Sequence, residues 1–266
     1  MTQIDKAGAE YWRTLWANSQ PPAPLDVAQG GLDNFVNQAF HAYIVSVLGE
    51  RGGSDAKLLE LGCAQSVWLP YFAHHHGFDV TGLDYDEGGC ARAEALLARA
   101  NVNGRIVTAD VMQPPKDMLG AYDVVTSFGL VEHFSDTAGF VDHCARFLAP
   151  GGLMLTEVPN MHGVNGWLCK QLNRPVYDIH VPLDVEALVE AHRRAGLEVL
   201  DARYLISLNL CVLHFEPFRF WPVQFLARAM PVVLSKLAWA MERAGLGIPV
   251  NRWTSPYVFC VATKPA

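Results

Sequence analysis

The chain has 266 residues, of which 51% are hydrophobic and 18% are charged, and its formal net charge at pH 7 is −7. This composition excludes a disordered chain, and the length is sufficient for one large domain or one domain with an appendage. The acidic charge and the lack of a Lys/Arg cluster in the sequence argue against a nucleic-acid partner, because phosphate backbones are bound by clustered basic side chains.

Cysteine usage and the most apolar stretch bear on the compartment. The six cysteines are scattered, without a C-x-x-C pair, and the N-terminal residues show no signal-peptide pattern. We therefore expect a reduced, cytoplasmic chain. The stretch 215–240 is interrupted by Glu216, Arg219, Arg228 and Lys236 and by three prolines, so it is not expected to span a membrane.

The first fifty residues are predicted to form a helical cap on the main domain. Tyr11, Trp12 and Trp16 fall in a short predicted helix, which a Pro- and Gly-rich loop follows. Apolar residues at helical spacing then predict a second helix over 33–49.

From residue 57 onward, short apolar runs alternate with helical patterns. Such alternation predicts a parallel, doubly wound sheet, and the continuous apolar runs indicate strands that are covered on both faces. We expect strands at 57–61, 79–84, 105–109, 122–127 and 153–158, and helices at 67–76, 86–101, 136–148 and 184–195.

The C-terminal part contains two predicted strands, 197–206 and 257–262, separated by an apolar, aromatic-rich insertion at 207–252. We interpret the insertion as a helical lid that packs on the sheet domain. Three alternatives stay open. It could wall an acceptor pocket together with the N-terminal aromatic residues, lie on a membrane surface, or form a dimer contact.

Two acidic residues end neighbouring predicted strands. Glu60 and Gly62 close the first strand, and Asp84 ends the second about twenty residues later. A strand, tight turn, helix and acid in this order hold a nucleoside, with the acid accepting from the ribose hydroxyls. Ala64 and Ser66 occupy positions where a pyrophosphate cradle needs glycine, so the pattern favours a nucleoside without phosphates.

Several motifs in fixed order resemble those of class I S-adenosylmethionine-dependent methyltransferases. They are Glu60-Leu61-Gly62-Cys63-Ala64, Asp84, Ala109-Asp110-Val111, Tyr122-Asp123-Val124-Val125, Phe128-Gly129-Leu130-Val131-Glu132-His133, Leu148-Ala149-Pro150-Gly151-Gly152 and the segment 180–188. The resemblance covers about residues 55–206 and the final strand. It implies a mostly parallel, seven-stranded Rossmann-like sheet with an antiparallel last strand. The expected organisation is a cap (1–50), a cofactor-binding core (51–206), the insertion (207–252) and a last core strand (253–266).

The resemblance also implies S-adenosyl-L-methionine as cofactor. Asp84 would bind the ribose, Asp110 the adenine amino group and the Val111 N–H the adenine ring. Family members usually carry glycine where this chain has Ala64 and Ser66. The expected cofactor residues are Glu60, Gly62, Cys63, Ala64, Asp84, Tyr85, Asp110, Val111, Ser127 and Phe128.

On the acceptor side, His133 is the candidate general base, because it follows the fourth strand, where acceptor and cofactor should meet. The alternative is a structural or cofactor-shell histidine. The function expected is methyl transfer to the oxygen or nitrogen of a small apolar or aromatic acceptor, by in-line displacement. Further candidate acceptor residues are Tyr11, Trp12, Trp16, Asn160, His162 and His180.

Two other functions remain open at this level: a dinucleotide-dependent oxidoreductase, and a non-catalytic partner protein with the methyltransferase fold. No metal site is expected, because His74, His75 and His76 point in different directions from one helix. We expect a monomer or homodimer with a small-molecule acceptor, and membrane-surface contact is not the favoured interpretation.

Overall fold

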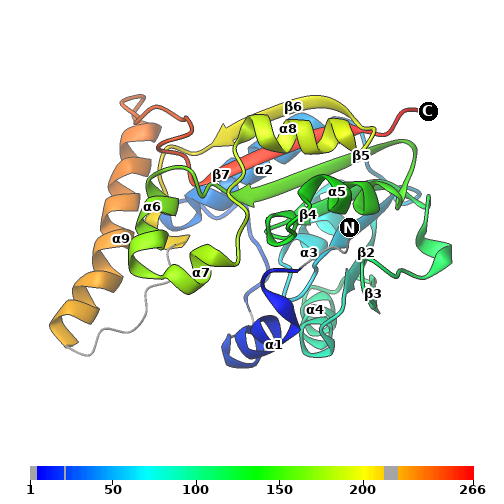
Figure 1. Cartoon of the computed structure of the whole chain (residues 1–266), viewed down its shortest axis with the longest axis horizontal. Coiled ribbons are helices and arrows are strands. Elements are labelled where there is room, and N and C mark those ends of the chain that lie inside the picture. Colours follow the sequence, from blue (N-terminus) through cyan, green and yellow to red (C-terminus); the bar gives the residue numbers. More distant parts are fainter. Residues whose placement is uncertain (1–4, 21, 213–220) are drawn as a thin grey trace.

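The computed structural model describes residues 5–20, 22–212 and 221–266, with side chains in the last range described from residue 229. The predicted apolar runs form one seven-stranded sheet in the order β3-β2-β1-β4-β5-β7-β6 (Figure 1). The strands are β1 (Lys57–Leu61), β2 (Asp79–Asp84), β3 (Arg105–Thr108), β4 (Tyr122–Phe128), β5 (Leu148–Pro159), β6 (Glu198–Leu205) and β7 (Tyr257–Thr263).

The strand directions confirm the predicted fold class. Neighbouring strands from β3 to β5 pair in parallel, and β7 pairs antiparallel with both β5 and β6. Strand β5 begins at Leu148, earlier than the predicted residue 153, because the residues of the predicted turn form backbone hydrogen bonds with the residue that follows β7. The Gly151 N–H donates to the Lys264 carbonyl oxygen at 2.9 Å, and the Lys264 N–H donates to that of Gly152 at 2.9 Å.

The helices agree with the predicted ranges to within about three residues at each end. Asp86, Asp136 and Asp184 each cap a helix by accepting a backbone N–H from three residues ahead. Two helices in the segment after β5, which was expected to be a loop, were not predicted. The helices are α1 (Gly8–Asn18), α2 (Phe35–Leu48), α3 (Trp68–His76), α4 (Glu87–Arg99), α5 (Thr137–Ala145), α6 (Val164–Leu172), α7 (Arg174–Asp178), α8 (Val185–Arg194) and α9 (Trp221–Arg243), with short 3-10 turns η1 (Leu32–Asn34), η2 (Lys116–Met118), η3 (Val131–His133) and η4 (Leu210–Val212).

The sheet separates two apolar cores, because successive side chains of a strand point to opposite faces. Leu58 and Val124 pack with α2, α3 and α4 on one face. Leu59 and Val125, the next residues along the same strands, pack with α5 and α8 on the other. Both faces are therefore covered, as the continuous apolar runs predicted.

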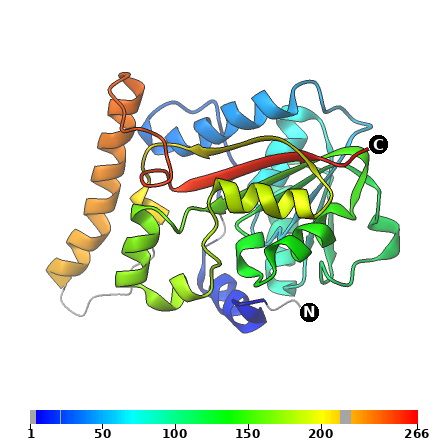
Figure 2. The same cartoon turned by 45° about the horizontal axis from the view of Figure 1, so that its top comes forward.

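Helix α9 lies at one end of the molecule, beside α6 in both views (Figures 1 and 2). Its Trp239 ring stacks on Phe35 at 5.5 Å between centroids, and its indole N–H donates to the Leu208 carbonyl oxygen at 2.6 Å. The described part of the insertion therefore contains a long helix that packs on the end of the sheet domain. Among the described residues, no helix has the length and apolar character needed to cross a bilayer.

Candidate active site

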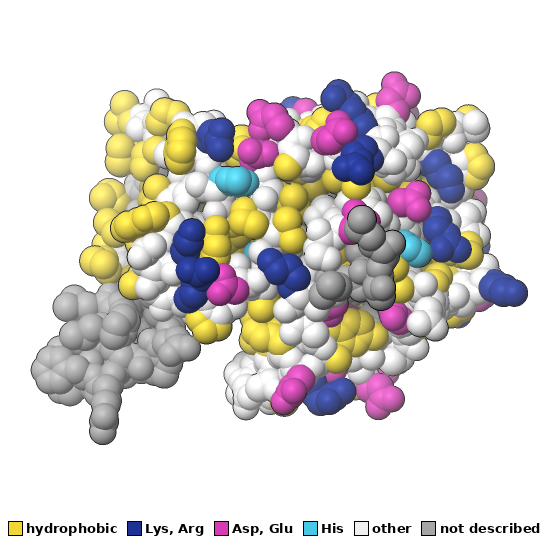
Figure 3. Space-filling view, in the orientation of Figure 1, with side chains coloured by type: hydrophobic (Ala, Val, Ile, Leu, Met, Phe, Trp, Pro, Cys, Tyr) yellow, Lys and Arg dark blue, Asp and Glu magenta, His cyan; other side chains and the backbone are white. Residues whose placement is uncertain are grey.

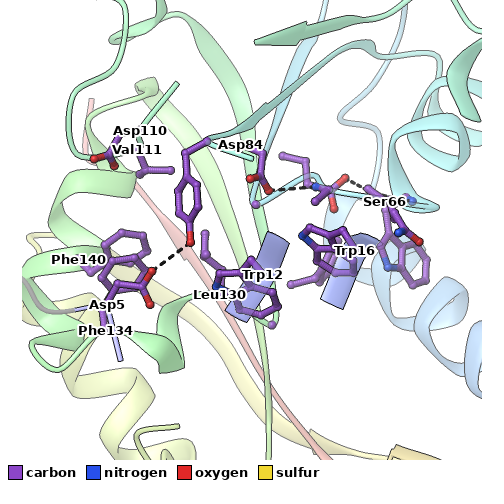
Figure 4. Close-up of a pocket in the computed structure, with 18 of the residues that line it drawn as sticks. Asp5, Trp12, Trp16, Ser66, Asp84, Asp110, Val111, Leu130, Phe134 and Phe140 are labelled. Atoms are coloured by element: carbon purple, nitrogen blue, oxygen red, sulfur yellow. Dashed lines mark hydrogen bonds between the residues drawn. The ribbon is translucent and has the colours of Figure 1, made fainter. Parts of the chain in front are cut away.

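A cavity of about 390 Å³ opens at the carboxyl ends of β1, β2 and β4. In the sheet, β2 and β3 lie on one side of β1, and β4 and β5 lie on the other. Open α/β sheets bind their ligands at the carboxyl ends of the strands where the strand order reverses in this way. The volume is in the range of small-molecule and cofactor sites. In Figure 4, Asp84 lies between an apolar wall that includes Val111, Phe134 and Phe140 and a side formed by Trp16 and Ser66.

The turn after β1 forms one wall of the cavity. Gly62 has a φ of 75°, and a Cβ built there would lie 3.3 Å from the Leu130 methyl groups, so this position requires glycine. Ala64 keeps a negative φ, which explains how alanine is accommodated. The Ser66 hydroxyl oxygen accepts from the Trp68 N–H, at the first residue of α3, at 3.0 Å.

Gly89, in the first turn of α4, was not identified from the sequence. A Cβ at this position would lie 2.5 Å from the Ala64 Cβ and 3.3 Å from Trp16. Because Gly89 has no side chain, α4 leaves space for the methyl group of Ala64 in the turn after β1. In the sequence, Gly89 appears only as a glycine in the first turn of a helix capped by an acidic residue. This pattern does not indicate which turn of the chain packs against it.

Glu60 is buried at the end of β1 and lines the cavity. The Ser66 hydroxyl donates to its Oε2 at 2.5 Å. Burial raises the pKa of this carboxyl to about 8, with a smaller contribution from Asp84, while the Ser66 hydrogen bond opposes the rise. Glu60 is therefore mostly protonated at neutral pH, and a cationic ligand group in the cavity would stabilise its ionised form.

Asp84 ends β2 and has both carboxylate oxygens oriented by the backbone. Oδ2 accepts from the Ala64 N–H at 3.1 Å, and Oδ1 accepts from the Asp86 N–H at 2.9 Å. Burial raises the pKa of Asp84, and these backbone hydrogen bonds oppose the rise. Each oxygen retains acceptor capacity, so the carboxylate can bind two neighbouring hydroxyls.

The cavity lining also includes Asp110, just after β3, and two phenylalanine rings, those of Phe134, just after η3, and Phe140, in α5. Asp110 is exposed, and its Oδ1 accepts from the Met112 N–H at 2.8 Å. The rings of Phe134 and Phe140 are stacked at 3.5 Å between centroids. A planar ring system with an amino group at its edge could contact these rings and the Asp110 carboxylate.

The N-terminal segment closes the cavity. The Lys6 N–H donates to the His133 carbonyl oxygen at 2.8 Å, and the Tyr85 hydroxyl donates to Asp5 Oδ2 at 3.2 Å. Helix α1 then places Trp12 and Trp16 in the cavity lining (Figure 4). These contacts join segments about eighty to 130 residues apart, which sequence patterns do not report.

Of the predicted cofactor residues, all line the cavity except two. Cys63 and Ser127 are fully buried behind it, and the Ser127 hydroxyl has no hydrogen-bond partner among the described residues. The cavity-lining members of the predicted set are Glu60, Gly62, Ala64, Asp84, Tyr85, Asp110, Val111 and Phe128.

The predicted acceptor residues are divided by the structure. Trp12 and Trp16 line the cavity, whereas Tyr11 only packs edge-on against Trp12. Asn160 is buried, and its amide donates at 2.8 Å to the carbonyl oxygens of Arg252 and Ser255. The backbone N–H of His162 donates to Asn160 Oδ1 at 3.1 Å. Both residues lie in the loop after β5, outside the cavity lining. No described residue of the 207–252 insertion lines this cavity.

His133 lies in η3 and is also outside the cavity lining. Its ring packs edge-on against the cavity residue Trp12, at 5.0 Å between centroids. Burial, with a smaller contribution from His180, lowers the pKa of His133 to about 3, so the imidazole is neutral at pH 7.

His133 belongs to a buried cluster with Glu132 and His180, whose nearest side-chain ligand atoms lie within 4.8 Å of one another. The Nδ1 atoms of His133 and His180 lie 3.0 and 2.6 Å from the carbonyl oxygens of Ile179 and Val176. Because a carbonyl only accepts, each Nδ1 carries the hydrogen and each Nε2 presents a lone pair. Oε2 of Glu132 has no hydrogen-bond partner among the described residues. These residue types can hold a divalent cation, whereas no metal site was predicted from the sequence.

Comparisons with known proteins identify the family and the fold. A family model described as a methyltransferase domain matches residues 35–202. The ubiquinone biosynthesis O-methyltransferase of Pseudomonas aeruginosa strain UCBPP-PA14 is 31% identical over 168 residues, which are 59% of this chain and 71% of that protein. A probable S-adenosylmethionine-dependent methyltransferase of Mycolicibacterium smegmatis is 32% identical over 164 residues, 60% of this chain and 59% of that protein. The crystal structure of geranyl diphosphate C-methyltransferase from Streptomyces coelicolor A3(2), in complex with Mg²⁺, geranyl diphosphate and S-adenosyl-L-homocysteine, has a similar fold. Its TM-score is 0.62 at 14% identity, over 96% of this chain and 97% of that one.

Proposed function

Because this chain belongs to the class I S-adenosylmethionine-dependent methyltransferases, we propose that it methylates a hydroxyl oxygen of a small phenolic acceptor. S-adenosyl-L-methionine is the methyl donor. The choice of oxygen and of an aromatic acceptor is supported by the O-methyltransferase relative and by the indole rings of Trp12 and Trp16 in the cavity lining.

The observation that carries the proposal is the pair of carboxyl groups, Glu60 and Asp84, at adjoining strand ends of one cavity. Glu60 suits the cationic amino-acid part of the cofactor, and Asp84 suits the two ribose hydroxyls. Asp110 and the stacked Phe134 and Phe140 suit the adenine. A dinucleotide would instead bring a pyrophosphate towards the Asp84 carboxylate and a turn that has Ala64 and Ser66 in place of glycine, which disfavours the oxidoreductase alternative.

The cofactor supplies a methyl group on a positively charged sulfur, which leaves as a neutral thioether. The residues of this chain bind the cofactor, position the acceptor and exclude water. Holding two reactants in line can lower a barrier by about 7–11 kcal/mol in favourable cases. Helix α1, tied down through Lys6 and Asp5, covers the cavity with two indole rings and serves this purpose.

We assign the acceptor proton to His133. The Nδ1 hydrogen bond to Ile179 leaves Nε2 as the proton acceptor. Burial lowers the pKa of His133 to about 3, so this role requires a nearby negative charge to stabilise the imidazolium. Glu132 Oε1 lies 3.7 Å from that Nε2 and would stabilise the imidazolium once ionised. Trp12 contacts the His133 ring and lines the cavity, so this role requires the Trp12 indole to move aside and admit the acceptor hydroxyl to His133.

The test is a methyl-transfer assay with labelled S-adenosylmethionine, phenols carrying apolar substituents, and the matched anilines. We expect O-methylated products from the phenols only. The variant His133→Asn should lower kcat by about 10²- to 10⁴-fold without changing the affinity for S-adenosylhomocysteine, while His74→Asn, at an exposed position, should be unchanged. Parallel assays with a chelator show whether activity depends on a cation bound by Glu132, His133 and His180. Methylation of the anilines alone would refute the oxygen assignment, and an unaltered kcat in His133→Asn would refute the role of this residue.

A further inference from the structure

Helix α9 exposes an apolar face to solvent. Along its described part, every third or fourth side chain points away from the protein, and all of these side chains are apolar. The five larger ones are between 38% and 63% exposed. We call this surface the outer face of α9; it consists of Met230, Val233, Leu234, Leu237, Ala240 and Met241.

The opposite side of the helix already provides its attachment to the protein. Ser235 and Trp239 are buried there, and the Ser235 hydroxyl oxygen accepts from the Leu210 N–H at 2.8 Å. Glu242 Oε2 accepts from the Ser207 hydroxyl at 2.6 Å. A surface helix normally presents polar side chains on its outer side, so the outer face of α9 is not explained by packing within this chain.

Exposed aromatic residues lie at the same end of the molecule. Trp167 on α6 is 62% exposed, and Trp253, after α9, is 61% exposed. The Val164 N–H at the start of α6 donates to the Trp253 carbonyl oxygen at 2.8 Å, which connects the two segments. Figure 3 shows hydrophobic side chains gathered at this end of the molecule. Tryptophan with one apolar and one polar edge is characteristic of the interface between water and lipid.

The segment that contains α9 is basic, although Asp33 and Asp184, from outside the segment, lie beside Lys236 and Arg252. Residues 221–253 contain four basic side chains and one acidic one, a net charge of +3, whereas the whole chain carries −7. Lys236 and Arg243 border the outer face, two helical turns apart. Lys236 is paired with Asp33, and Arg243 donates to the Gln38 side-chain oxygen at 2.5 Å.

We propose that the α9 end of the molecule docks on an anionic lipid bilayer. The outer face of α9 enters the boundary between headgroups and acyl chains, and the bordering basic side chains lie at the level of the lipid phosphates. The helix lies in the plane of the surface and does not span the bilayer. A second copy of the chain fits less well, because a two-fold contact would place this basic segment against itself.

The experiment is co-sedimentation of the full chain with vesicles of phosphatidylcholine, with and without phosphatidylglycerol, at low and high salt. We expect binding to the anionic vesicles that weakens as salt rises. The double variant Val233→Glu/Leu237→Glu should lower vesicle binding by about tenfold or more, because both side chains are exposed and the core is left intact. The matched control is Val45→Glu/Leu200→Glu, which changes two exposed apolar side chains on α2 and β6 and should bind as the wild type does.

The proposal is overturned if the protein binds neither type of vesicle. It is also overturned if the two double variants lose vesicle binding to the same extent. Analytical ultracentrifugation of the same proteins measures self-association and so tests whether a second copy of the chain covers the outer face of α9. Self-association that Val233→Glu/Leu237→Glu abolishes, without vesicle binding, would assign the face to a second copy and overturn the lipid assignment. No outcome depends on methyl transfer, so failure of the proposed acceptor chemistry leaves this test intact.

Discussion

Replacing Asp84 by asparagine tests the cofactor site most directly. The carboxylate accepts two backbone N–H groups, from Ala64 at 3.1 Å and from Asp86 at 2.9 Å, and these orient it towards the cavity. The variant Asp84→Asn preserves the shape of the side chain but removes the charge and one acceptor oxygen. The ribose hydroxyls then lose charge-assisted hydrogen bonds.

A hydrogen bond to a charged group contributes about 1.5–3 kcal/mol, and one between neutral groups about 0.5–1.5 kcal/mol. For two ribose hydroxyls the difference is about 2–3 kcal/mol, which corresponds to a loss of about 30- to 150-fold in affinity. Asp79→Asn is the matched control, because Asp79 begins the same strand and is exposed at its other end.

The assay is calorimetric titration of S-adenosylhomocysteine into the wild type and both variants, with NADH as the negative control ligand. Urea unfolding of each variant checks that the fold is retained. An affinity of Asp84→Asn within about threefold of the wild type would refute the assignment of Asp84 to the ribose. An equal loss in Asp79→Asn would show that the effect is not specific to the cavity.

Three further outcomes follow from the burial of single residues. Burial raises the pKa of Glu60 to about 8, so the affinity for S-adenosylhomocysteine, measured calorimetrically, should rise by up to about tenfold per pH unit from pH 6 towards 8. The rise should level off above 8, and a slope that persists in Glu60→Gln would contradict this assignment. A Cβ at Gly82 would lie 2.6 Å from the Cys63 sulfur, so Gly82→Ala should lower the free energy of unfolding by about 1–3 kcal/mol in urea, while Gly30→Ala, which meets no neighbour, should stay near wild type. Phe140 is fully buried, and Phe140→Ala should cost about 3–5 kcal/mol in the same measurement; a change below about 1 kcal/mol would show that its packing has been misjudged.

The strands and the cofactor side of the site could be predicted from the sequence for a local reason. Strands covered on both faces are short apolar runs, so their limits are visible in the residues themselves. A parallel sheet places the carboxyl ends of its strands at one edge, and Glu60, Asp84, Asp110 and Phe128 each stand at or just after such an end. Local pattern and topology together therefore place these side chains around one cavity.

The acceptor side depends on contacts between distant segments. The position of helix α1 over the cavity rests on Lys6 and Asp5 meeting residues far along the chain, and the space for Ala64 rests on Gly89 of another helix. The helices α6 and α7 were missed in a segment expected to be a loop. His133 was expected where cofactor and acceptor meet, and the structure places it behind Trp12.

What the sequence determined by itself is the alternation of strands and helices, the order of the cofactor motifs and the acidic residues at the strand ends. All of these depend on neighbouring residues or on the general rules of parallel sheets. Only the tertiary structure decided which aromatic residues face the cavity, which histidines are buried together, and which side of α9 meets solvent. Helix α9 is apolar on more than one side, so its periodicity does not distinguish the face that packs from the face that stays exposed. That distinction arises from the surrounding elements, because burial is a property of the packed molecule and not of the local pattern.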